Sequence, residues 1–320
     1  MRRTRLLSIM LLLGAAESYS QTQTLCFKDK LSGTSVHIIG TMHYNPHSVK
    51  KVEDVIRQYG SDGRLGAVVL EQCKERWALT QSMQPPGSML RGLLDNEFQA
   101  AAELASFYDR EYSETIRLVL ADEDIRDNNE RMNDAFASTI RDIANPGKGG
   151  WRAIALDLRR AYAENTSVVP TVSVGRCCRD EREYLGYADL FDANLLLSAP
   201  ISLIRYILAF VAKKPIRGSL LLTWVSALIA YGLMIHDTGD LTLTDEAMAT
   251  AVGLLLNLFI GVPLLGRVVL VALLSERNKI IASHIRAECD RLQAEGRTDQ
   301  ECIVVLGLAH CNGVKRILCE

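Results

Sequence analysis

The chain has 320 residues and is nearly neutral, with 36 basic and 38 acidic residues and a net charge of −2. This length is sufficient for one large α/β domain, or for a domain that carries an insertion. The basic residues are spread along the chain, so the charge pattern gives no indication of nucleic-acid binding.

Residues 1–20 have the organisation of a secretory signal peptide. Arg2, Arg3 and Arg5 precede an apolar run over residues 6–16, and small and polar residues follow it. The run is short for a bilayer span, although an uncleaved anchor or an organelle-targeting leader starts in a similar way. We therefore expect an ER-directed leader and a location in a membrane or the secretory pathway. The alternative is an organelle membrane, such as that of the mitochondrion or plastid.

The hydrophobic pattern after this leader predicts alternating strands and helices. Residues 34–41 alternate and are β-branched, residues 47–59 have helical spacing, and residues 65–70 form an apolar run typical of a strand buried on both faces. Such a strand–helix–strand unit crosses over right-handedly, so its two strands are expected to be parallel or near neighbours in one sheet. The later elements predicted are a helix over 97–108, a strand over 116–120, a helix over 126–143, a strand or helix over 151–158, a strand over 301–306 and a short final strand over 314–318.

These elements indicate an α/β (α+β) fold with a central, mostly parallel sheet, flanking helices and a large apolar helical insertion. The α/β domain would comprise residues 21–192 and 276–320, and the insertion residues 193–275. Inside the insertion, residues 219–235 and 247–266 carry no charge and approach the length of about 20 residues that crosses a bilayer. They form either a two-span membrane hairpin or two helices buried in a helical subdomain. The basic residues beside them would put the α/β domain in the cytosol, whereas a cleaved leader would put it in the lumen.

Two histidines occupy equivalent positions after two predicted strands. Gly40 and His43 follow the first strand, and Gly307 and His310 follow the strand near the C-terminus, each pair in a G-x-x-H arrangement. Glu71 directly follows the second strand. Ligands gather beyond the carboxyl ends of parallel strands, so these side chains are expected at one edge of the sheet. Two histidines and a glutamate suit a catalytic divalent metal with an open position for water, and Mn²⁺, Co²⁺ or Zn²⁺ would accept them.

Each of these residues also has a structural interpretation. A single G-x-x-H histidine is more often a cap or a loop-packing residue than a ligand. A buried Glu71 is also explained by an ion pair with Arg76 or Arg277, and Arg76 is expected to orient Glu71 rather than to bind substrate. His47 follows a proline, which favours the first turn of the next helix over a place beside His43.

Eight cysteines lie outside the leader, and none of them forms a C-x-x-C motif. Neither a zinc ribbon nor a thioredoxin-type site is therefore indicated. Most are expected to be buried thiols. Cys302, Cys311 and Cys319 flank the predicted site and are the ones to test for pairing.

Several short stretches keep one order along the chain: residues 37–48 (HIIGTMHYNPHS), 68–76 (VVLEQCKER), 97–98 (EF), 118–122 (LVLAD), 275–278 (SERN) and 304–310 (VVLGLAH). As a set they resemble the TraB/PrgY family, in particular its eukaryotic TraB-domain members. The resemblance implies the fold shared with Tiki proteases, erythromycin esterase and ChaN-like haem-binding proteins. It also implies metal ligation by His43 and His310, with Glu71 as a ligand or general base. The residues implied to support the site are Gly40, His47, Arg76, Glu97, Asp122, Glu276, Arg277 and Gly307, with Glu276 and Arg277 as a pair.

The chain departs from the family pattern at two places. Relatives tend to have Gly-Asp-Arg after the third strand, where this chain has Ala-Asp-Glu at 121–123, so a cationic partner for Asp122 is expected to be missing. Asn278 stands where many relatives have aspartate. A role of these positions in stabilising a transition state is therefore not carried over.

The resemblance and the residues together favour a metal-dependent hydrolase, peptidase-like, acting on a peptide or a small carbonyl substrate. One alternative is a non-enzymatic, membrane-associated protein that binds or sequesters a peptide signal, or tethers partners. A further alternative is a haem or iron binder with a histidine as axial ligand. No oligomeric state follows from the sequence.

Overall fold

The computed structural model describes residues 23–112, 115–165, 184–186, 189, 191–216, 219, 223, 226–227, 251–253, 255 and 257–320. The expected leader at residues 1–20 lies outside the described residues, as does most of the apolar run at 219–235.

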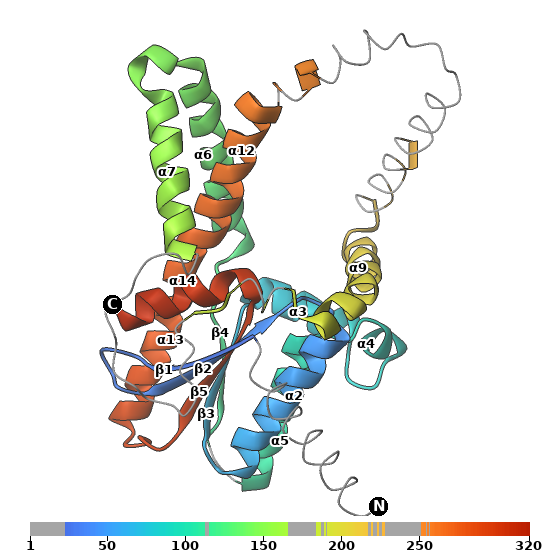
Figure 1. Cartoon of the computed structure of the whole chain (residues 1–320). Helices are drawn as coiled ribbons and strands as arrows, with labels where there is room; N and C mark the ends of the chain where they lie inside the picture. Colours follow the sequence, from blue (N-terminus) through green and yellow to red (C-terminus); the bar gives the residue numbers. More distant parts are fainter. Residues whose placement is uncertain are drawn as a thin grey trace, which may run out of the picture.

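A five-stranded sheet forms the centre of the fold and confirms the predicted α/β class (Figure 1). Its order is β1-β2-β5-β3-β4; β1 pairs antiparallel with β2, and the other described pairs are parallel. The strands are β1 (Thr24–Lys28), β2 (Ser35–Thr41), β3 (Leu65–Leu70), β4 (Arg117–Leu120) and β5 (Glu301–Gly307). The first two predicted strands, β2 and β3, are parallel as expected, but β5 from the far end of the chain lies between them.

The register of the parallel strands brings their carboxyl ends to one edge. Thr41 of β2 lies opposite Gly307 of β5, and Leu70 of β3 lies opposite Val305. Glu71 follows Leu70 directly, so it lies beside the last residues of β5. The predicted meeting of the strand ends is confirmed in this register.

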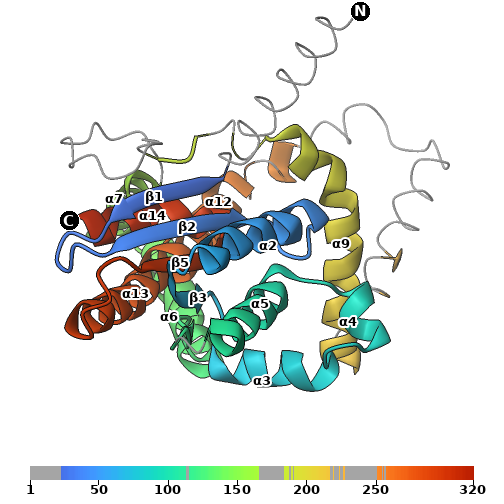
Figure 2. The same cartoon turned by 90° about the horizontal axis from the view of Figure 1, so that it is seen from below.

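Helices cover both faces of the sheet (Figure 2). On one face lie α2 (Pro46–Ser61) and α5 (Glu97–Tyr112), and on the other α13 (Glu276–Ala294) and α14 (Leu308–Cys319). The helix predicted over 47–59 is thus present, and it begins where the Asn45 side chain accepts hydrogen bonds from the backbone N–H groups of His47 and Ser48.

One predicted strand, near the C-terminus, needs correction. Residues 314–318 are not a strand but the second half of α14, since Cys311, Val314 and Leu318 recur at helical spacing and are all buried against the sheet. Residues 151–158, which fitted either structure, are helical and belong to α7 (Gly150–Asn165). Strand β1, which pairs with β2 at the sheet edge, was not predicted at all.

The apolar insertion contributes two described helices that are long and apolar enough to cross a membrane, which by length and composition alone is weak evidence of crossing. The first is α9 (Ala193–Lys213), which lies along the side of the α/β domain from α2 to α4 (Met89–Leu93) (Figure 2). The second is a continuous helix over Ala251–Ala294, which overlaps the apolar run predicted at 247–266 and ends in α13.

This second helix is too long to lie in a bilayer as a whole. Its 44 residues correspond to about 66 Å at about 1.5 Å per residue, against about 30 Å of hydrocarbon. Partway along, the buried Arg267 contacts Asp142 and Asp157, each at 2.5 Å. These carboxylates belong to α6 (Ile125–Ala144) and α7, which flank the helix (Figure 1). The part from Arg267 onward is therefore packed against protein.

Candidate functional site

His43 lies in the loop between β2 and α2, next to the start of α5. Its Nδ1 lies 2.6 Å from Oε1 of Glu97, a fully buried carboxylate in the first turn of α5. The other Glu97 oxygen accepts the backbone N–H of Tyr44 at 3.2 Å. Because a carboxylate only accepts, Nδ1 of His43 is the donor and carries a hydrogen. Glu97, one of the residues expected to support the site, thus contacts His43 and the following residue.

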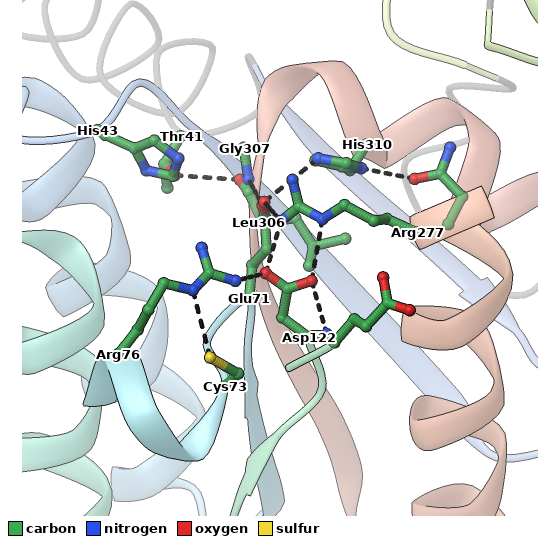
Figure 3. Close-up of polar contacts among 12 residues, drawn as sticks. Thr41, His43, Glu71, Cys73, Arg76, Asp122, Arg277, Leu306, Gly307 and His310 are labelled. Carbon is green, nitrogen blue, oxygen red and sulfur yellow. Dashed lines mark hydrogen bonds and ion pairs between the residues drawn. The ribbon is translucent and has the colours of Figure 1, made fainter. Parts of the chain in front are cut away.

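Glu71 is buried at the end of β3, and both of its oxygens have partners. Oε2 accepts the backbone N–H of Gly307 at 2.7 Å, and Oε1 accepts a guanidinium N–H of Arg277 at 2.8 Å. Nε2 of His310 lies 3.2 Å from the same Oε1. Of the two arginines considered for Glu71, Arg277 is the one that pairs with it (Figure 3).

His310 lies in the first turn of α14 and is oriented by a chain of two amides. Its Nδ1 is 2.6 Å from Oδ1 of Asn278, and Nδ2 of Asn278 is 2.7 Å from Oδ1 of Asn165. Asn165 donates in turn to the Ala161 carbonyl and the Ser275 hydroxyl. These two acceptors fix which end of each amide is oxygen. His310 therefore carries its hydrogen on Nδ1, as His43 does.

Gly313 and Gly307 provide the space for this arrangement. A Cβ on Gly313 would lie 2.1 Å from Nδ2 of Asn278. A Cβ on Gly307 would lie 3.3 Å from Oε2 of Glu71 and 3.7 Å from Nε2 of His43. Nε2 of His310 thus faces the Glu71 carboxylate, and Nε2 of His43 lies beside the same glycine as that carboxylate. Gly40 has a packing role instead, since a Cβ there would lie 2.6 Å from Leu308 of α14.

The electrostatics of this centre depend on the close approach of acids and bases. Burial alone would raise the pKa of the Glu71 carboxyl, but the charge and hydrogen bond of His310, together with His43 and Arg277, hold it well below its usual range. Burial alone would lower the pKa of His43, but the hydrogen bond and charge of Glu97, with the charge of Glu71, raise it. An ionised Glu71 therefore faces two histidines that each have one nitrogen already donating.

A second carboxylate, Asp122, lies behind Glu71 and shares its arginine. Arg277 donates from Nε to Oδ1 of Asp122 at 2.9 Å, and Arg76 of α3 (Lys74–Met83) also pairs with Asp122. Asp122 therefore has two cationic partners, both supplied by distant segments, and the expectation that its partner is missing is wrong. Arg76 bonds Asp122 and the Cys73 sulfur rather than Glu71, so it affects Glu71 only through Asp122 and Arg277.

Two of the expected supporting residues lie away from this centre. His47 is in the first turn of α2, with Nε2 4.0 Å from Asp192. Glu276 pairs with Lys279 at 2.8 Å, so the Glu276–Arg277 pair implied by the resemblance is not among the described contacts. From the sequence, Asn278 was recognised only as a departure from the family pattern. No sequence pattern indicated that Asn165 would contact it.

The described cysteines form no disulfides. Cys302, Cys311 and Cys319 are free thiols in the structure, as are Cys26, Cys73 and Cys289. Burial, and then the charge of Glu71, raises the pKa of Cys311, which keeps it protonated. The remaining two, Cys177 and Cys178, lie outside the described residues.

In the part of the chain that the structure describes, no group of three or more His, Cys, Asp or Glu side chains is placed to hold a metal ion as it stands. The donor chemistry nevertheless fits one. Each histidine has its Nδ1 engaged by an oxygen acceptor, the usual arrangement of a metal-ligating histidine, and the carboxylate between them is ionised. No family model matches the chain, and no curated protein matches it.

Proposed function

We propose that the chain is a metal-dependent hydrolase of the TraB/PrgY type, peptidase-like, acting on a peptide or a small carbonyl substrate. His43, His310 and Glu71 would hold a divalent ion, Mn²⁺, Co²⁺ or Zn²⁺. Such an ion supplies Lewis acidity and makes water nucleophilic near neutral pH.

One observation carries this proposal. Nε2 of His310 lies only 3.2 Å from Oε1 of Glu71, while both histidines have Nδ1 bonded to another oxygen. Two acceptors at this distance repel each other unless a proton or a cation lies between them, and in the metal-free protein a proton on His310 fills that place. A divalent ion would replace this proton and would also engage the remaining nitrogen of His43, which lies beside Gly307.

The surrounding residues hold this centre in place. Arg277 bridges the carboxylates of Glu71 and Asp122, which fixes the direction of Glu71. Glu97 increases the basicity of His43 through its charge, whereas the Asn278 amide orients His310 without adding charge. Glu71 would serve either as a ligand or as the general base that accepts a proton from an attacking water.

We also propose that the protein is associated with a membrane. The support is that α9 and the helix over Ala251–Ala294 have the length and composition of membrane-spanning helices. Both are joined to the site: Ser202 of α9 donates to the His43 carbonyl, and the long helix carries Arg277 and Asn278.

The hydrolase is tested by elemental analysis of the purified full-length protein. We expect close to one divalent ion per chain, and we expect His43→Ala and His310→Ala each to lose it while remaining folded. His47→Ala is the matched control, because His47 faces Asp192 instead of the centre and its loss should leave the metal content unchanged. Full metal content in both site variants would overturn the proposal. Peptide binding that persists in EDTA and in both variants would instead favour a sequestering protein, and a Soret band on haem titration a haem binder.

A further inference from the structure

Beside the candidate centre, the end of α9 places an ammonium group that has only neutral partners. Nζ of Lys213 lies 3.2 Å from the Thr80 hydroxyl and 3.5 Å from the Tyr44 hydroxyl. Among the residues that the structure describes, no carboxylate lies within ion-pair distance of it. A cation in the last turn of a helix is favoured by the helix carbonyls. That preference does not explain why Lys213 is partly buried beside two neutral hydroxyl groups.

Arg76 lies one helical turn before Thr80 on α3, and the charges around it are already balanced. Arg76 and Arg277 are matched by the two carboxylates of Asp122 and Glu71. Lys213 therefore adds one positive charge that this group does not neutralise.

Tyr44 contributes a neutral donor at the same place. It follows His43 directly and has a φ of 61°, a left-handed conformation that a tyrosine rarely adopts. Strained residues of this kind cluster at functional sites. The conformation places its ring edge-on to Tyr206 of α9 and its hydroxyl beside Lys213.

The donors of this group outnumber its acceptors. The Tyr44 oxygen accepts from Lys213, which leaves the tyrosine hydrogen unused. Arg76 uses Nε on Cys73 and one Nη on Asp122, and its other Nη makes no hydrogen bond to the described residues. We propose that Tyr44, Arg76 and Lys213 form a binding site for a carboxylate of the substrate, such as the terminal carboxylate of a peptide.

An anionic oxygen group would complete this cluster. It would accept hydrogen bonds from the three donors and neutralise the surplus charge, and ionic hydrogen bonds of this type are the stronger ones. The site adjoins the His43 loop, so a carboxylate held there would anchor a chain that extends toward Glu71. As a substrate site this inference rests on the proposed hydrolase, but carboxylate binding itself does not require a metal.

The test measures how fast Lys213 is acetylated, by mass spectrometry of the full-length protein from which metal, and then the chelator, have been removed. N-acetylglycine and N-acetylglycinamide are matched probes, since they differ only in the carboxylate. We expect the acid to slow labelling of Lys213 severalfold and the amide to leave it unchanged. The exposed neighbour Lys214 serves as an internal reference in the same sample. Lys214→Met is the control variant and should retain the protection of Lys213.

Tyr44→Phe removes one hydroxyl and should weaken protection by the acid about tenfold, equal to about 1.4 kcal/mol. Arg76→Gln should weaken it at least as much. Equal protection by acid and amide, no protection by either, or protection that survives both substitutions together would overturn the carboxylate site. Because the protein is metal-free throughout, these outcomes do not depend on metal binding. Absence of metal from the native protein would overturn the hydrolase proposal, and that result is separate from the outcomes above.

Discussion

Replacing Glu97 by glutamine removes the charge behind His43 while keeping the shape of the side chain. The Glu97 carboxylate accepts the Nδ1–H of His43 at 2.6 Å and the backbone N–H of Tyr44 at 3.2 Å. A glutamine oxygen replaces one of these acceptors. The NH₂ group of the glutamine replaces the second acceptor, so two donors then face each other. Residue 97 is 0% exposed, so water does not relieve this contact.

The size of the effect follows from these contacts. A hydrogen bond to a charged group contributes about 1.5–3 kcal/mol, and an unsatisfied buried donor costs about 1–3 kcal/mol. The His43 side chain is 39% exposed, which favours the lower end, so we expect Glu97→Gln to reduce the free energy of unfolding by about 2 kcal/mol. If His43 is a ligand, losing this partner should also weaken metal binding about 10- to 100-fold.

Urea unfolding in EDTA measures the first effect, and titration of the metal-free protein with Zn²⁺ or Mn²⁺ measures the second. The matched control is Glu276→Gln, because Glu276 is an exposed partner of Lys279. It should change the unfolding free energy by less than about 0.5 kcal/mol and leave metal affinity unchanged. If Glu97→Gln is no more destabilising than Glu276→Gln, the buried Glu97–His43 contact does not contribute the stability assigned to it. If stability falls but metal affinity does not, His43 is not a ligand.

Two further predictions concern packing and pH. Gly313→Ala would place a Cβ 2.1 Å from Asn278, so we expect urea unfolding to show a loss of about 1–3 kcal/mol in the free energy of unfolding. Gly147→Ala is the control and should be nearly neutral, because nothing lies within 4 Å of its Cβ. Similar losses in both variants would contradict the prediction. Burial, and then the charges of nearby cations, lowers the pKa of His37 to about 4 from 6.5. The unfolded chain therefore binds the extra proton between these values, and stability should fall by up to about 3 kcal/mol as the pH drops through that window. His37→Gln keeps an acceptor for Tyr59 and should show a smaller fall; an unchanged pH dependence would refute the assignment.

The strands and the location of the site were predictable because local patterns determine them. The apolar run at β3 is buried along its whole length, as its composition predicted. The two G-x-x-H motifs follow strands that end at the same level, since parallel strands in register share a carboxyl edge. The helical nature of 314–318 was missed because five residues do not distinguish a short strand from the end of a helix whose first turn contains His310.

The sequence by itself therefore determined the α/β class, the strands β2, β3, β4 and β5, and the meeting of the strand ends that carry His43, Glu71 and His310 at one edge. Only the tertiary structure decided the partners of these residues. Arg277 reaches Glu71 from 206 positions away, and Asn278 contacts His310 across 32 positions. Contacts over such separations depend on how helices pack on the sheet, and a local pattern carries no information about that packing. The same packing places Lys213, from within the apolar insertion, beside the loop that carries His43.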